Sequence, residues 1–351
     1  ISGRLLYVKE DQLSLRELES GTIRTFTSAV KFLASDASGA YLSVSPDRAH
    51  IAFNGSDQLY GCSTNHPEKP CALNELYGFF LTTIASDETT IIAPYALGPL
   101  SWSPQDNLFV YSSPDFNQVP YRTSLKISSP AGGEPFALTS GEHLDSRPSW
   151  SPSGEWVAFL RAPSPPPDQP ECETGSLFYN TCTDPDLYII RADGSGLKQL
   201  VTHVRVLNSP YSAPAWSPDG KTLAVISGTD ADKITLVEPD SGNITILQAP
   251  APLTSQPAWS PDGQAMLFFV LDGDENHVYV LEIGSNNLII VSRNNSNDLF
   301  PAWSPDGSTV LYITKNPDGK GTLHMQSVED MRQSSWAFPE ISPKYGVIWL
   351  R

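Results

Sequence analysis

The chain has 351 residues and a formal charge of −17, because 39 acidic residues outnumber 22 basic ones. Nucleic acids and anionic membrane surfaces require basic patches, so this balance excludes both as partners and leaves basic proteins or divalent cations. Only 17% of residues are charged, whereas prolines and glycines number 31 and 24, which indicates many tight turns and few exposed helices.

No run of the sequence approaches the roughly 18 apolar residues that span a bilayer. We therefore expect no transmembrane segment. The sequence begins at Ile1 and shows no leader-like apolar run, which is compatible with a processed, exported protein or with a trimmed one. Membrane association is expected only through a partner or through an N-terminal anchor that has been removed.

Three strand-like runs open the chain. They span Arg4 to Lys9, Leu13 to Leu18 and Thr22 to Thr27, and turn residues separate them. The apolar run Tyr345 to Leu350 at the other end of the sequence is suited to supply a fourth strand. We expect the two ends of the chain to meet in one sheet, because their pairing would remove exposed strand edges.

From residue 44 onwards one motif recurs, typified by Ala-Trp-Ser-Pro-Asp-Gly at residues 215–220. Close copies begin at Trp259 and Trp303, and looser copies begin at Val44, Trp102 and Trp150. Ser-Pro-Asp-Gly favours a type I turn, because proline presets the backbone angle and glycine relaxes the exit. A β-rich apolar run follows each turn. The motif therefore predicts a hairpin, with its tryptophan packed as an apolar slab between neighbouring units.

The spacing of the motif indicates the architecture. The best copies lie 43 residues apart (216 to 259) and 44 residues apart (259 to 303), and periods of about 40 to 50 residues with four short strands are typical of β-propellers. We predict an all-β chain that forms a single closed β-propeller domain over residues 1–351. Six blades with the motif plus one composite blade, made from both chain ends, give seven four-stranded blades. Six blades is the alternative, if the N-terminal strands form a cap or the unit near Ala40 is incomplete.

Two long insertions interrupt the repeats, at residues 55–76 and 162–183. Each holds two cysteines, and we predict two local disulfides, with free thiols or metal binding as the alternatives. The four residues concerned are Cys62 with Cys71 and Cys172 with Cys182. Disulfides form in oxidising compartments, so we expect an extracytoplasmic location, whether periplasmic, cell-surface or secreted.

The copies preceded by Pro-Ala, at residues 214–220, 257–263 and 301–307, resemble the TolB-type β-propeller repeat, and the likeness covers most of the chain. The resemblance implies an exported propeller that docks protein partners. Similar repeats also build the gating propellers of prolyl-oligopeptidase-like peptidases. The sequence departs from the cell-envelope TolB protein, because we expect seven blades, no preceding α/β domain and cysteine-bearing insertions. The partners of that protein are therefore not transferred.

The sequence holds no nucleophile elbow of the form Gly-x-Ser-x-Gly, no His-Glu-x-x-His zinc helix and no phosphate-binding glycine loop. We therefore predict a non-enzymatic interaction or scaffold subunit of an extracytoplasmic or membrane-associated complex, without a cofactor. One alternative is a calcium-dependent propeller hydrolase or lyase with a site at the mouth of the channel. Another is a propeller detached from a prolyl-oligopeptidase-like peptidase.

The segments that lead into the innermost strands should crowd one mouth of the central channel, and several of them are polar. Our candidate partner-binding residues there are Asp145, Ser146, Arg147, Tyr211, Ser212, Ser255, Gln256, Asn297 and Asp298. One acidic cluster offers oxygen ligands for calcium, with a solvated hairpin loop as the alternative. Its members are Asp272, Asp274 and Glu275.

Overall fold

The computed structural model places 29 β-strands and no helix among the residues that it describes. No helix there is long and apolar enough to cross a membrane. The described residues are 3–9, 12–26, 31–32, 42–56, 77–115, 117, 122–162, 184–207, 213–273, 275–292, 297–329, 333–341 and 347–350.

Both ends of the sequence contribute to the first sheet, which has the order β29-β1-β2-β3. Its strands are β1 (Arg4–Lys9), β2 (Gln12–Glu17), β3 (Ile23–Thr25) and β29 (Ile348–Leu350). The second sheet has the order β4-β6-β7-β8, with β5 also paired to β6. Its strands are β4 (Lys31–Phe32), β5 (Leu42–Val44), β6 (His50–Ser56), β7 (Tyr77–Thr83) and β8 (Thr89–Pro94).

An eight-stranded sheet follows, and it consists of two antiparallel groups joined by a single parallel contact between Thr123 and Leu144. The first group is β9 (Leu97–Trp102), β10 (Phe109–Asp115), β11 (Arg122–Ser128) and β12 (Phe136–Ala137). The second group is β13 (Leu144–Trp150), β14 (Trp156–Ala162), β15 (Asp186–Arg191) and β16 (Lys198–Val201).

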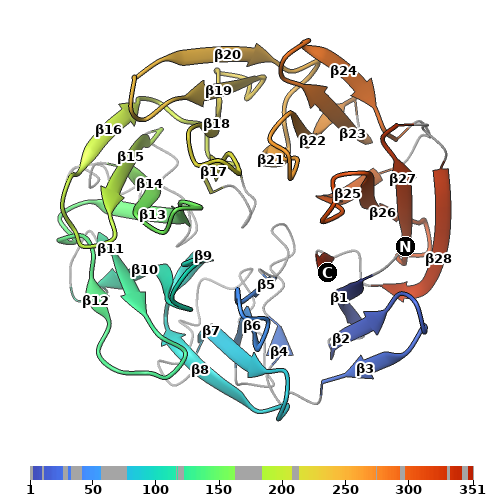
Figure 1. Cartoon of the computed structure of the whole chain (residues 1–351), viewed down its shortest axis with the longest axis horizontal. Helices are drawn as coiled ribbons and strands as arrows, with labels where there is room; N and C mark the ends of the chain where they lie inside the picture. Colours follow the sequence, from blue (N-terminus) through green and yellow to red (C-terminus); the bar gives the residue numbers. More distant parts are fainter. Residues whose placement is uncertain are drawn as a thin grey trace, which may run out of the picture.

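Three four-stranded antiparallel sheets complete the chain. They are, first, β17 (Ala215–Trp216), β18 (Leu223–Ser227), β19 (Lys233–Val237) and β20 (Ile244–Gln248). The next is β21 (Ala258–Trp259), β22 (Ala265–Asp272), β23 (Glu275–Glu282) and β24 (Asn287–Ile290). The last is β25 (Asn297–Trp303), β26 (Thr309–Lys315), β27 (Gly321–Ser327) and β28 (Gln333–Ile341). Figure 1 shows the sheets arranged around a central axis, with β17, β21 and β25 near the axis and β20, β24 and β28 at the periphery.

The expected meeting of the two chain ends is confirmed, because β29 pairs with β1 in antiparallel register, with Trp349 opposite Leu5. Several predicted boundaries were wrong by a few residues. The third N-terminal strand is only Ile23–Thr25, and the C-terminal strand begins at Ile348 rather than at Tyr345. Residues 55–56 and Ala162, which we assigned to the insertions, belong to the paired strands β6 and β14.

Apolar side chains form seven clusters in the described part of the chain, and each cluster lies between neighbouring groups of strands. The motif tryptophans contribute to these clusters, as predicted, and each does so on the side of the preceding group. Trp349 occupies the same position in the cluster that joins the last group to β1. It is therefore a further motif position that the sequence analysis missed, 46 residues after Trp303 by subtraction.

Three motif tryptophans also hydrogen-bond to the preceding group. The indole Nε1 of Trp216 donates to Ser149 O at 3.1 Å, that of Trp259 to Ala215 O at 3.0 Å, and that of Trp303 to Ala258 O at 3.1 Å. Each acceptor is the residue just before the motif tryptophan of the preceding group. A single side chain thus supplies both apolar contact and a directional bond between neighbouring groups.

The motif turns show why serine and aspartate recur. The Ser304 Oγ donates to Asp306 Oδ1 at 2.6 Å and accepts from Thr309 N, while Asp306 Oδ1 also accepts from Ser308 N and Ser308 Oγ. The bond from Ser304, followed by those from Ser308, lowers the pKa of Asp306 from 3.8 to about 2. The glycine adopts a positive φ, 75° at Gly307, which residues with a Cβ rarely adopt.

Consecutive turns also touch. A Cβ placed on Gly263 would lie 3.5 Å from Pro218 Cδ, and one on Gly307 would lie 3.4 Å from Pro261 Cδ. The glycine of one motif therefore packs against the proline of the preceding motif.

We predict that Trp216→Phe will destabilise the protein by about 1–2 kcal/mol more than Trp102→Phe, because only the first change removes an indole hydrogen bond. The Trp102 Nε1 is buried without a partner in the described part of the chain, so it provides a matched control for the loss of ring size. Urea denaturation measures both changes. Equal losses would mean that the indole bond adds nothing to packing.

We also predict that Ser304→Ala will raise the pKa of Asp306 from about 2 towards its ordinary value, as followed by NMR of the carboxyl carbon. Because the folded-state pKa is depressed, the stabilisation by Asp306 is complete above about pH 4 and is lost as the pH falls towards 2. The depressed pKa of Asp262, which depends on Ser260, should stay unchanged as the internal control.

Candidate functional site

The antiparallel order of the strands separates two faces of the molecule. We call the face with the Ser-Pro-Asp-Gly turns the turn face, and the opposite face, where β13, β17, β21 and β25 begin, the loop face. The chain leaves β14 at Ala162 and leaves β6 at Ser56 on the loop face, because both strands start at a motif turn. The described candidate residues that precede the inner strands therefore lie on the same face as the ends of β6 and β14, after which the two insertions follow in the sequence.

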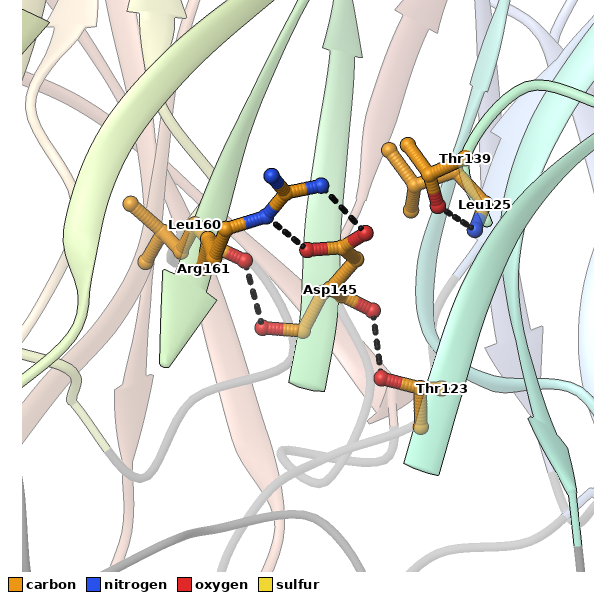
Figure 2. A network of polar contacts seen from close by, with 7 residues as sticks. Thr123, Leu125, Thr139, Asp145, Leu160 and Arg161 are labelled. Carbon is orange, nitrogen blue, oxygen red and sulfur yellow. Dashed lines mark hydrogen bonds and ion pairs between the residues drawn. The ribbon is translucent and has the colours of Figure 1, made fainter. Parts of the chain in front are cut away.

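A buried ion pair lies at the start of β13. Arg161 Nε and Nη2 donate to the two carboxylate oxygens of Asp145 at 2.7 and 2.9 Å (Figure 2). The Asp145 side chain is 1% exposed and that of Arg161 12%. The guanidinium of Arg161 also lies over the rings of Phe159 and Tyr188, at 5.3 and 5.1 Å from the centroids. A bidentate, water-poor pair of this kind fixes the geometry of both side chains.

The backbone around Asp145 is held as well. Thr123 Oγ1 donates to Asp145 O at 2.7 Å, which ties the start of β13 to β11 of the preceding group (Figure 2). Ser146 Oγ reaches Leu160 O at 3.5 Å. In the preceding group, Leu125 N of β11 donates to Thr139 Oγ1, which follows β12, at 2.9 Å. The start of β13 is therefore braced on both sides by hydroxyl groups.

Arg147 links two consecutive groups of strands. Its side chain is buried, and its Nη2 donates to Leu207 O, at 3.3 Å, in the segment that leads towards β17. Its φ of 56° coincides with the register shift of β13 between Ser146 and Ser149. A bulge of this kind re-aims a side chain, and here the Arg147 side chain points to the next group.

The same leading segment is anchored at the base of the second insertion. Val204 N donates to Pro185 O at 2.8 Å, and Arg205 Nη1 forms an ion pair with Asp184 Oδ1 at 3.0 Å. Asp184 is the first described residue after the second insertion. The segment 204–207 thus links the start of β13, through Arg147, to the base of the second insertion.

Asp298 occupies the position equivalent to Asp145, five residues before a motif tryptophan, and is also fully buried. Thr314 Oγ1 donates to Asp298 Oδ1 at 2.6 Å, so a hydroxyl stands where Arg161 stands in the other sheet. Nearby, the His324 ring stacks on Tyr312 with centroids 4.9 Å apart. Burial lowers the pKa of His324, and the negative charge of Asp298 partly offsets this decrease.

Of the remaining candidates, some form hydrogen bonds within the chain, and others lie outside the described residues. Ser255 Oγ accepts from Phe269 N at 3.0 Å, and Gln256 Nε2 donates to Ala224 O at 3.1 Å in the preceding sheet. Tyr211 and Ser212 lie outside the described residues, and of Asn297 only its place at the start of β25 is described. Asp145, Arg147, Ser255 and Asp298 thus form a buried polar wall on the loop face, whereas Ser146 and Gln256 are half-buried. The role of these candidates in binding a partner stays a prediction.

The predicted disulfides and the calcium site fall largely outside the description. Cys62, Cys71, Cys172 and Cys182 all lie outside the described residues, as does Asp274. Asp272 and Glu275 face each other across the β22–β23 hairpin, and Glu275 lies 3.8 Å from His277. Among the residues that the structure describes, no group of three potential metal ligands is found.

Sequence reasoning missed Arg161, Thr123 and Thr314, which complete the wall. The pairing of the two strands in each inner hairpin could have identified Arg161 and Thr314. Asp145 lies opposite Arg161, and Asp298 lies opposite Thr314. Counting back from each motif turn along both strands would have brought these pairs together.

The repeats and their arrangement match a known family. Residues 180–344 match the family model described as the TolB beta propeller domain. Over these residues, just under half of the chain, the sequence is similar to the TolB-type β-propellers. Among curated proteins, none matches this propeller.

Solved structures share the fold of this TolB-type propeller at low identity. A structure from a study of two prolyl endopeptidases has a TM-score of 0.64 and 14% identity, over 99% of this chain and 49% of its own. An oligogalacturonate lyase in complex with manganese has a TM-score of 0.63 and 14% identity, over 91% and 83%. TolB from Acinetobacter baumannii has a TM-score of 0.50 and 14% identity, over 100% and 80%. The propeller thus spans about half of the endopeptidase chain, and these likenesses establish the fold alone.

We predict that Arg161→Met will destabilise the propeller by about 3–5 kcal/mol, because it leaves the Asp145 carboxylate buried without its partner. Adding Asp145→Asn to that variant should recover much of the loss, since the buried charge is then removed. Arg205→Met, which breaks the exposed pair with Asp184, should cost about 1 kcal/mol or less and serves as the control. Urea denaturation of the four proteins tests this, and equal costs at Arg161 and Arg205 would contradict it.

Proposed function

We propose that the protein is a closed, seven-bladed propeller, exported from the cytoplasm, that works as a non-enzymatic interaction or scaffold subunit. Seven hydrophobic clusters between successive groups of strands, the last of them joining β25–β28 to β1, support the closed count of seven. Export is supported by the two pairs of cysteines that lie close together in the sequence and by the TolB-type repeats. The partner is a protein in an extracytoplasmic or membrane-associated complex.

The observation that carries this proposal is the construction of the loop face. Its buried polar groups are bound to one another, as in the pair of Asp145 with Arg161 and the bond from Arg147 to Leu207. Such a wall is rigid, because each member is fixed by internal bonds. The two long insertions both depart from this face, so partner contact is assigned first to residues 57–76 and 163–183.

To test this proposal, each insertion is replaced by a short Gly-Ser linker, and partner recovery is compared by quantitative co-purification after crosslinking in the source cell. We expect at least one deletion to reduce recovery about tenfold or more, because contacts at interface centres dominate binding energy. Replacing residues 85–88, in the turn between β7 and β8 on the opposite face, with Gly-Ser is the control and should leave recovery intact. Thermal unfolding checks that every variant keeps the propeller.

Unchanged recovery with both deletions would remove the loop face as the docking surface. Turnover of an extracellular sugar or lactone by the purified protein, abolished by Asp298→Asn, would instead overturn the non-enzymatic proposal and favour the calcium-dependent hydrolase or lyase.

A further inference from the structure

Strand β20 forms an exposed outer edge. It is last in the order β17-β18-β19-β20 and, in the described part of the chain, pairs only with β19. Figure 1 shows it at the periphery of the molecule. Outer edges of this kind carry backbone groups that can pair with another chain, and natural proteins protect them with charges, prolines or bulges.

The side chains of β20 lack that protection. Ile246 and Ile244 are 60% and 52% exposed, the highest values among the exposed large hydrophobic residues described, whereas Leu247 packs into the cluster shared with the next sheet. From Ser241 to Pro261 the sequence contains no charged residue. In contrast, β3 carries Arg24 and β16 carries Lys198.

The backbone of β20 has unpaired N–H and C=O groups along the edge that faces away from β19 in the described part of the chain. Asn243 O accepts from Glu238 N, and Ala249 N donates to Asp232 O, so these two residues face β19. Hydrogen-bonding direction alternates along an antiparallel strand. The N–H and C=O groups of Ile244, Ile246 and Gln248 therefore point away from β19, towards the outside.

Exposed apolar side chains also occur in the two preceding groups of strands. Lys198 Nζ donates to Pro239 O, which brings the start of β16 against the turn before β20. Leu197, next to Lys198, is 48% exposed, and Phe136, 49% exposed, lies 3.8 Å from where a Cβ of Gly194 would stand. Four exposed apolar side chains thus follow the periphery of three adjacent groups.

Charge decides between possible occupants. Exposed Asp193, Glu238 and Asp240 flank this stretch. The chain as a whole carries −17, so a second copy would be repelled. A partner with basic residues on either side of its apolar strand complements this surface.

We propose that the outer edge of β20 accepts an extended segment of a partner protein as an additional strand. The segment has apolar residues at alternating positions, which contact Ile244 and Ile246, and lysine or arginine residues at its ends. Main-chain bonds to Ile244, Ile246 and Gln248 supply affinity, and the side chains supply selectivity, as in other cases of strand addition. The inference extends the interaction function proposed above to a second surface, without relying on the loop face.

The test uses a fluorescein-labelled peptide of about nine residues, with alternating valine and threonine between paired lysines, the length of an ordinary strand. Fluorescence anisotropy should show saturable binding that weakens as salt is added. Ile246→Lys should weaken binding about tenfold or more, because it places a like charge against the peptide. Ile290→Lys, on the neighbouring outer strand β24, is the matched control and should change binding by less than about twofold.

Hydrogen exchange of the complex should protect the amides of Ile244, Ile246 and Gln248. Absence of saturable binding, equal loss with Ile290→Lys, or equal binding of a peptide with glutamate ends would each overturn the proposal. A dimer in sedimentation that Ile246→Lys dissolves would overturn it in favour of a second copy. Peptide binding should persist when both insertions are deleted, so the failure of this inference is distinguishable from the failure of the proposed function.

Discussion

The contact between each motif tryptophan and the preceding group of strands is the interaction on which the rest of the structure depends. A four-stranded sheet of this size cannot bury both of its faces alone, so its stability comes from its neighbours. The indole fills that interface, and at Trp216, Trp259 and Trp303 it also bonds to a backbone carbonyl. Packing therefore fixes the distance between neighbouring groups of strands, and the hydrogen bond fixes how far one group is shifted relative to the next along the central axis.

The features that could be predicted from the sequence depend on short sequence patterns and on their repetition. The Ser-Pro-Asp-Gly turns and the strands after them depend on residues close in sequence. The meeting of the chain ends was inferred from the repeat, because the three N-terminal strands lacked a fourth. Trp349 was missed as a motif position because the Ser-Pro-Asp-Gly sequence that marks the other copies does not accompany it. Boundaries at Ile23 and Ile348 depend on how far pairing extends, which propensity alone does not set.

The site was harder to predict because polar residue type does not reveal burial. Asp145, Arg147 and Asp298 were selected as surface candidates, yet each is buried with a bond inside the chain. Pairing Asp145 with Arg161 required the register of a strand that shifts near Arg147. The exposure of Ile244 and Ile246 was likewise hidden, because a period-2 pattern does not say which side of an outer strand is covered.

The packing of each motif glycine against the previous proline has a consequence for how such a protein changes over evolutionary time. Since Gly263 meets Pro218 in the way that Gly307 meets Pro261, successive junctions are chemically interchangeable. A duplicated or lost repeat would find matching surfaces on both sides. The number of units is then limited by the curvature of the arrangement around the central axis, whereas the chemistry of the junctions sets no limit on that number.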